Sequence, residues 1–229
     1  MNLWVMKTLK KHIWEVNTML VSEMMITDVA TVSENDSLNK AFQILYERNH
    51  KVLPVVKDGK LCGLLTDKLL SEVRPSKATS LSVYEINYLM SKTKVKDIMK
   101  PEVFTVSPEA LIEDAASIMY TNDIGSLPVI RKDKTLVGIV TQTDIFKALI
   151  MLMGVNHEGT RIALETANDV GVVANITRIL SEAKINISSI SNYVKGENQH
   201  EIILKLDTQE IGDVPEKLSQ AGYRITSVH

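Results

Sequence analysis

Hydrophobic positions along the chain alternate between helical spacing and short continuous runs. In residues 111–120 apolar side chains recur every three or four positions, which predicts an amphipathic helix ending at the turn 122–125. Two continuous apolar runs follow, Leu127–Ile130 and Leu136–Val140, and a charged turn separates them, which predicts two strands. A second helix is predicted from Gln142 onward. The predicted order is strand, helix, strand, strand, helix.

The same pattern occurs twice. Residues 21–33 align with residues 95–107 at an offset of 74 positions, with Val, Met, Val, Thr, Val and Ser in common. Identities at apolar and turn positions in the same order predict a duplicated unit of about 55 residues. Further coincidences, the last two after one inserted residue, are Ala41 with Ala115, Ile44 with Ile118, Tyr46 with Tyr120, Leu53–Val55 with Leu127–Val129, Gly63 with Gly138, and Thr66 with Thr141.

Two short motifs stand complete in the second copy. They are the tetrapeptide SLPV at residues 126–129 and the heptapeptide GIVTQTD at residues 138–144, with a charged turn between them. This combination resembles the cystathionine-beta-synthase (CBS) domain, and two copies in tandem over residues 20–150 resemble a Bateman module. The resemblance implies an α/β module of two pseudo-twofold-related units, with clefts that bind adenosyl ligands such as AMP, ADP or ATP as effectors. It implies no catalytic activity.

Thr141 and Asp144 begin the helix that follows the second of these motifs. The Thr141 hydroxyl is suited to cap the free N–H groups of this helix, and Asp144, three residues later, completes a capping box. A carboxylate in the first turn, at the mouth of a cleft, also suits two hydrogen bonds from a ribose diol. In the first copy Thr66 keeps the cap, but Leu69 takes the place of Asp144. We expect one copy to read ribose and the other not, with the helix cap alone as the alternative.

Further ligand residues follow from the CBS resemblance rather than from the chemistry alone. It implies that the residues just before each LPV triplet lie near the ligand phosphates, and a lysine suits that role. The backbone at Thr105 and Val106 is expected near the base. The alternative is that Arg48, His50 and Lys51 form a solvated helix end, where their positive charges interact favourably with the helix dipole. The residues expected at the adenosyl site, besides Thr141 and Asp144, are Thr105, Val106, Ser126, Pro128, His50 and Lys51.

The C-terminal third has a different character. Its pattern predicts βαββαβ, the ferredoxin-like order, which is an α+β fold. The turn 168–173 together with residues 185–187 resembles the ACT domain, a regulatory unit that binds amino acids, although Val170 replaces the usual proline. The resemblance implies Asp169, Gly171 and Asn186 as effector residues. A helix cap at Asp169 and a turn glycine at Gly171 explain the same stretch without a ligand.

These divisions predict six segments. Two CBS units followed by an ACT unit resemble the acetoin utilisation protein B family, which implies a role around acetoin or related carbon catabolism. Residues 1–18 lack the apolar centre of a signal peptide, and we expect an appended leader there. The segments are the leader 1–18, the first CBS domain 19–75, a helical connector 76–94, the second CBS domain 95–153, a hinge 154–160 and the ACT domain 161–229.

Composition narrows the function classes. A net charge of −2 without a long basic block favours neither nucleic acid nor an anionic membrane, and the longest apolar run is too short to cross a bilayer. The single cysteine, Cys62, sits in a predicted strand, which fits a reducing, cytoplasmic compartment. The five histidines are scattered without metal-ligand spacing, and no G-x-S-x-G motif occurs. We expect neither a metal nor an enzyme.

The favoured function is a non-catalytic sensor that binds an adenosyl ligand and relays the signal to an ACT dimer or to a partner enzyme. Two alternatives stay open, an enzyme of acetoin metabolism and a structural dimerisation protein with empty clefts. A homodimer is expected for two reasons: both modules resemble families whose members pair, and a lone βαββαβ unit leaves an apolar strand face at Ile202, Leu204 and Leu206 partly uncovered.

Overall fold

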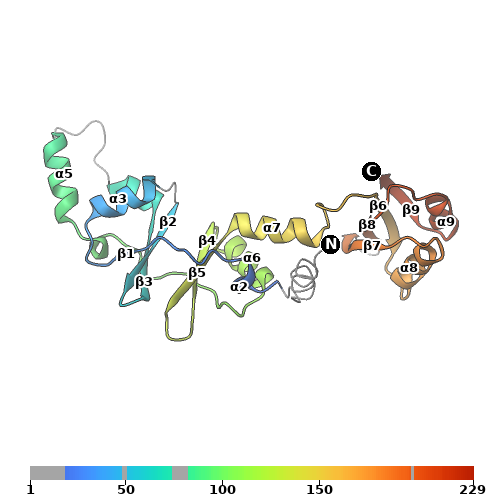
Figure 1. Cartoon of the computed structure of the whole chain (residues 1–229), viewed down its shortest axis with the longest axis horizontal. Helices are drawn as coiled ribbons and strands as arrows, with labels where there is room; N and C mark the ends of the chain where they lie inside the picture. Colours follow the sequence, from blue (N-terminus) through green and yellow to red (C-terminus); the bar gives the residue numbers. More distant parts are fainter. Residues whose placement is uncertain (1–18, 48–50, 74–81, 197–198) are drawn as a thin grey trace, which may run out of the picture. The chain divides into compact units, whose positions relative to one another are not determined.

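A computed structural model describes residues 19–47, 51–73, 82–196 and 199–229. These residues form two compact units, divided between Ile145 and Phe146 (Figure 1). Within the described ranges no helix combines the length and the apolar character that a membrane span requires.

The first sequence copy forms a three-stranded sheet with a helix on either side of its hairpin in the sequence. Its elements are β1 (Val32–Ser33), α3 (Leu38–Glu47), β2 (Val52–Lys57), β3 (Lys60–Thr66) and α4 (Asp67–Val73). Strand β1 is parallel to β2, and β2 is antiparallel to β3. The apolar residues of α3, β2 and β3 face one another and form a buried core, as the repeat pattern predicts.

The second copy repeats this arrangement with α6 (Ile112–Thr121), β4 (Ser126–Ile130), β5 (Leu136–Thr141) and α7 (Gln142–Leu152). Strands β4 and β5 are antiparallel. The strand predicted at the start of this copy is reduced to one parallel bridge between Val106 and Val129. The predicted helices and hairpin are confirmed.

Each copy is completed by an arm from the other copy. The N-terminal arm, residues 19–31, contains α2 (Val21–Met24), and Ile26 forms an antiparallel bridge with Ile139 of the second copy. The corresponding arm of the second copy contains the short 3-10 helix η1 (Val95–Asp97), and its Lys100 pairs with Leu64 of the first copy. The arms therefore cross between the copies.

The two hairpins also meet at their turns. The Leu61 N–H donates to the Lys134 carbonyl oxygen at 3.0 Å, and the Leu136 N–H donates to the Gly59 carbonyl oxygen at 3.2 Å. These four residues are repeat equivalents at the offset of 75. The paired bonds fit a pseudo-twofold axis between the turns, so the copies form one module.

The connector between the copies forms α5 (Val83–Lys92), as the pattern predicts. Ser82 and Glu85 cap it reciprocally: the Glu85 N–H donates to Ser82 Oγ at 3.3 Å and the Ser82 N–H donates to Glu85 Oε2 at 2.8 Å. The apolar residues of α5 do not all face the first core. Met90 packs against the first core, whereas Tyr88 and Leu89 are exposed.

The C-terminal unit contains the predicted βαββαβ order. Its four strands form one antiparallel sheet in the order β7-β8-β6-β9, and two helices cover one face. On that face Ile202, Leu204 and Leu206 are buried, so the uncovered strand face expected from the sequence, one of the two reasons for a homodimer, is wrong. The elements are β6 (Arg161–Ala167), α8 (Val172–Glu182), β7 (Ile187–Gly196), β8 (Gln199–Leu206), α9 (Val214–Gln220) and β9 (Arg224–Val228).

The segment predicted as a hinge is packed against this sheet. A Cβ atom at Gly154 would lie 3.3 Å from the Ser189 side chain, and a Cβ atom at Gly159 would lie 2.0 Å from the Leu206 carbonyl oxygen. The Lys205 ammonium donates to the Gly159 carbonyl oxygen at 2.7 Å. Gly159 has a φ of 131°, where a side chain is strained. Residues 154–160 therefore dock on the domain that follows them.

Candidate functional site

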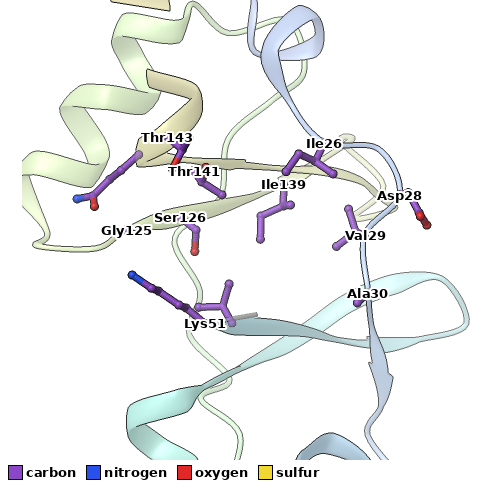
Figure 2. A pocket seen from close by; sticks show the side chains of 12 residues that line it. Ile26, Asp28, Val29, Ala30, Lys51, Gly125, Ser126, Ile139, Thr141 and Thr143 are labelled. Carbon is purple, nitrogen blue, oxygen red and sulfur yellow. The ribbon is translucent and has the colours of Figure 1, made fainter. Parts of the chain in front are cut away.

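A pocket of about 440 Å³ lies between the two copies of the first unit (Figure 2). Its walls come from the N-terminal arm, the starts of β2 and β4, and the junction of β5 with α7. A pocket of this size suits a small organic ligand. The lining residues are Ile26, Asp28, Val29, Ala30, Lys51, Val52, Gly125, Ser126, Ile139, Thr141, Gln142 and Thr143.

The pocket is polar at one end and apolar in the middle. Figure 2 shows Lys51 on the same side as Ser126 and Thr143, with Ile26 and Ile139 between them and the opposite end. Lys51 is exposed, and it supplies a positive charge beside hydroxyl groups. Such a division suits a ligand with a flat apolar part and a polar or anionic part.

Thr141 and Asp144 form a close pair at the start of α7. The Thr141 N–H donates to Asp144 Oδ2 at 2.8 Å, and the Thr141 hydroxyl donates to the same oxygen at 2.7 Å. The half of the capping box expected of Asp144 is confirmed, because its carboxylate accepts from the Thr141 N–H. The Thr141 hydroxyl, which was expected to accept from a helix N–H, donates to the same carboxylate oxygen. One oxygen of Asp144 is occupied, which leaves Oδ1 for a ligand and not the pair of oxygens expected for a ribose diol.

The first copy uses the equivalent threonine differently. The Leu69 N–H donates to Thr66 Oγ1 at 3.1 Å, so Thr66 caps α4 as predicted. Leu69 packs against the first core. The threonine that lacks a carboxylate partner caps the helix itself, which accounts for the asymmetry between the copies.

The structure gathers only part of the predicted adenosyl site. Lys51, Ser126 and Thr141 line the pocket, and Asp144 adjoins it through Thr141. Pro128 is buried in β4 and is not among the lining residues. His50 lies outside the described residues.

Thr105 and Val106 also lie outside the lining of this pocket. The Val106 N–H donates to the Pro128 carbonyl oxygen at 3.1 Å, and the Val106 carbonyl accepts from the Ile130 N–H at 3.0 Å. The Val106 backbone groups, which were expected to meet a base, are therefore bonded to β4.

Sequence reasoning missed the arm residues Asp28, Val29 and Ala30 at the pocket. At the repeat offset, Thr105 corresponds to Thr31, which directly follows this arm segment. Because the arms cross, the arm of the first copy lies beside Thr141 of the second. The repeat identifies equivalent residues, but it does not show which copy each arm covers.

The C-terminal unit has a second, smaller pocket of about 260 Å³ at the turn between β6 and α8. Asp169 and Gly171 line it, together with Asn192 and His200, which sequence reasoning missed. The His200 Nδ1 and Asn192 Oδ1 atoms lie 3.0 Å apart, within hydrogen-bond distance. Asn186 lines another cavity, so the structure does not bring the three predicted effector residues together.

The turn at this second pocket departs from the predicted cap. The residue that caps α8 is Gly171, with a φ of 92°, and no side chain makes a capping hydrogen bond there. The expected role of Asp169 as a helix cap is therefore wrong, whereas the expectation of a turn glycine at Gly171 is confirmed.

The Cys62 thiol lies in a setting that disfavours its ionisation. Burial raises the pKa of the Cys62 thiol, and Cys62 Sγ lies 3.4 Å from the Val55 carbonyl oxygen. A nucleophilic cysteine needs a lowered pKa. Across the described part of the chain, no group of three or more His, Cys, Asp and Glu side chains is placed to hold a metal ion.

A tandem repeat of two α/β units with a pocket between its copies defines the class of paired repeat modules. The CBS domain family matches residues 21–74 and 95–151. The CBS domain-containing protein YhcV of Bacillus subtilis is 30% identical over 125 residues, which cover 55% of this chain and 81% of YhcV. The chain belongs to the CBS domain family.

Other relatives differ in how much of their length this chain matches. MJ1426 of Methanocaldococcus jannaschii is 30% identical, with 58% of this chain and 92% of that protein covered. Homoserine O-acetyltransferase of Methanohalobium evestigatum is 35% identical over 56% of this chain, which spans only 24% of that enzyme. The chain thus spans less than half of some curated relatives that it matches.

Solved structures show similar coverage. A CBS domain-containing protein from Bacillus anthracis aligns with a TM-score of 0.50 and 22% identity, over 57% of this chain and 91% of that chain, which shows the fold. A protein named for acetoin utilization (AcuB) from Vibrio cholerae aligns with a TM-score of 0.49 and 27% identity, over 60% and 94%. The plant protein CBSX2, solved in complex with AMP, aligns with a TM-score of 0.48 and 28% identity, over 57% and 96%.

Proposed function

We propose that this protein is a non-catalytic regulator that binds an adenosyl ligand in the pocket between its CBS copies. The carrying observation is the division of that pocket, with Lys51 and hydroxyl groups at one end and Ile26 and Ile139 in the middle. A purine base suits the apolar middle, ribose suits Thr141 and Thr143, and a phosphate suits Lys51. AMP, ADP, ATP and S-adenosylmethionine share the adenosine part of this pattern.

Calorimetric titration with these four compounds tests the proposal. We expect at least one of them to bind, and Lys51→Met to weaken a phosphate-bearing ligand by about ten- to hundredfold, since a charge-assisted hydrogen bond contributes about 1.5–3 kcal/mol. Adenosine, which has no phosphate, is the matched control and should lose little affinity. No binding by any of the four compounds would favour a structural dimerisation protein.

The output of this sensor is proposed to be a partner enzyme. In homoserine O-acetyltransferase and in the inosine-5'-monophosphate dehydrogenase of Methanocaldococcus jannaschii, the matching region amounts to 24% and 22% of the protein. In this chain the matching region is followed in the sequence by a βαββαβ domain. The order of these parts resembles the acetoin utilisation protein B family, so an enzyme of acetoin or related carbon catabolism is the proposed partner, and an enzyme activity of the chain itself is the alternative.

The C-terminal domain is proposed to be an ACT domain with an amino-acid effector. The supporting observation is the pocket of about 260 Å³, in which the β6–α8 turn at Asp169 and Gly171 faces the pair Asn192 and His200. A carboxylate, an amide and an imidazole suit the ammonium and carboxylate groups of an amino acid. Titration with the standard amino acids tests this, and His200→Ala should weaken any that binds.

A further inference from the structure

The pocket wall formed by the N-terminal arm is attached to the second copy at one point. Ile26 and Ile139 exchange two backbone hydrogen bonds, each with an N···O distance of 2.9 Å. Both residues line the pocket, and Asp28, Val29 and Ala30 follow directly along the arm. The position of the wall therefore depends on how closely the arm approaches β5 at this bridge.

A glycine sets that approach. A Cβ atom at Gly138 would lie 2.4 Å from Met25 Sδ and 3.1 Å from the Ile26 carbonyl oxygen. A distance of 2.4 Å is too short for any real contact, so the methionine sulfur occupies the space that a side chain at residue 138 would need. Met25 is half-buried, and its flexible thioether fills the gap against the bare backbone.

The opposite arm repeats this contact at the other end of the module. A Cβ atom at Gly63 would lie 2.5 Å from Met99 Sδ, and Leu64 and Lys100 exchange two backbone hydrogen bonds of 2.9 and 3.0 Å. None of these four residues lines the pocket of about 440 Å³. The chain thus contains two equal contacts, only one of which borders that pocket.

We propose that Met25 and Gly138 form a size-matched latch that positions residues 26–30 as a wall of the ligand pocket, so that ligand occupancy and docking of the arm are coupled. The coupling rests on the proposed function, whereas the latch itself does not. A ligand that contacts residues 28–30 meets them only when the arm is docked. By linkage, the ligand must then favour the docked arm by the same factor by which docking favours the ligand.

Substitutions at the glycine test the positioning role. Gly138→Ala should weaken binding of AMP by about tenfold or more, because overpacking by one methyl group displaces the arm. The double variant Gly138→Ala with Met25→Ala should recover much of this loss, since it removes the sulfur that the new methyl group meets. Gly63→Ala is the matched control: it makes the same clash at the other latch and should leave AMP affinity near that of the native protein.

Amide hydrogen exchange at Ile26 and Ile139 provides a readout that does not require ligand. Gly138→Ala should speed this exchange and Gly63→Ala should not, and AMP should slow it in the native protein. If Gly138→Ala and Gly63→Ala lowered the melting temperature equally while AMP affinity stayed native in both, the glycine would be structural only and the latch would be overturned. If the native protein bound no adenosyl compound, the proposed function and the coupling would fail together, and faster exchange in Gly138→Ala alone would still support the latch.

Discussion

At the residue scale, the pair Thr141 and Asp144 decides how the second copy differs from the first. Because Asp144 Oδ2 accepts from both the N–H and the hydroxyl of Thr141, the carboxylate fixes the orientation of a pocket residue. The sequence correctly predicts that Asp144 completes the cap at the start of the helix by accepting from the Thr141 N–H. It does not predict that the Thr141 hydroxyl donates to the carboxylate, because in a capping box this hydroxyl accepts from a helix N–H.

Replacing Asp144 separates its two roles. Asp144→Ala should lower the free energy of unfolding by about 1 kcal/mol or less, as expected for a first-turn acid. It should weaken adenosyl binding by about ten- to hundredfold if Oδ1 accepts one ribose hydroxyl, since a hydrogen bond to a charged group contributes about 1.5–3 kcal/mol. Calorimetric titration with AMP measures the loss of affinity, and titration with 2′-deoxy-AMP shows whether the lost hydrogen bond is to the ribose 2′-hydroxyl.

Leu69→Ala is the control within the same chain. Leu69 packs against the first core, so its truncation should lower stability and leave adenosyl affinity nearly unchanged. 2′-deoxy-AMP should bind the native protein more weakly than AMP does. The two compounds should bind Asp144→Ala almost equally, because the partner of the 2′-hydroxyl is gone. Native affinity in Asp144→Ala, with only a lower melting temperature, would show that the carboxylate acts as a cap alone.

At the element scale, the sequence predicts the helices and hairpins well, because their apolar periodicity reports which face is buried. The crossing of the arms could not be predicted in this way. Ile26 and Lys100 pair with strands of the opposite copy, and nothing in a local pattern states which of two equivalent strands an arm will join. The docking of segment 154–160 was not predicted, for a related reason. Glycines such as Gly154 and Gly159 are typical of a hinge, but they are equally suited to a close backbone approach.

The stability of the C-terminal unit should depend on pH through Glu165 of its sheet. A hydrogen bond from Lys195 holds the pKa of Glu165 below its usual value, and the charge of Arg224 acts in the same direction. The folded pKa is thus lower than the unfolded pKa, so this carboxylate contributes stability above its unfolded pKa, and the contribution is lost as the pH falls through the folded pKa. Thermal unfolding of the native protein should show this loss below about pH 4.3, the unperturbed value for glutamate.

Glu165→Gln should flatten that acid dependence, because the titrating group is gone. Glu182→Gln is a suitable comparison, since it removes an exposed ion pair with Arg178 on α8, in which the side chains are 64% and 61% exposed for Arg178 and Glu182. Equal flattening by both variants would mean that the effect follows net charge and not the contacts of Glu165 on the sheet.

At the scale of the whole molecule, a homodimer remains a prediction, but its structural reason is an exposed edge strand and not an uncovered sheet face. Strand β7 is an edge of its sheet, and its Ile190 and Val194 are 41% and 68% exposed. An exposed apolar edge strand is a pairing surface. Light scattering at micromolar concentration should show a dimer, and Val194→Lys should shift it toward monomer. Val228→Lys, on the opposite edge strand β9, should have less effect, and a native monomer would refute the prediction.

The last prediction concerns communication between the adenosyl pocket and the C-terminal domain. Helix α7 begins at the pocket residues Gln142 and Thr143 and ends at Leu152, two residues before Gly154. Gly154 lies against Ser189 of the C-terminal sheet. A displacement of α7 on ligand binding would therefore reach a packed contact and not a free linker.

AMP should accordingly change amide exchange protection within residues 161–229, with the largest change expected in β7 around Ser189. Gly154→Ala should alter this AMP-induced change in protection, because a Cβ atom there would lie 3.3 Å from the Ser189 side chain and disturb the contact. Gly212→Ala is its control, since Gly212 also has a positive φ but has open space around it. If AMP changed protection only within residues 20–150 of the native protein, the two domains would be independent and the relay would be wrong.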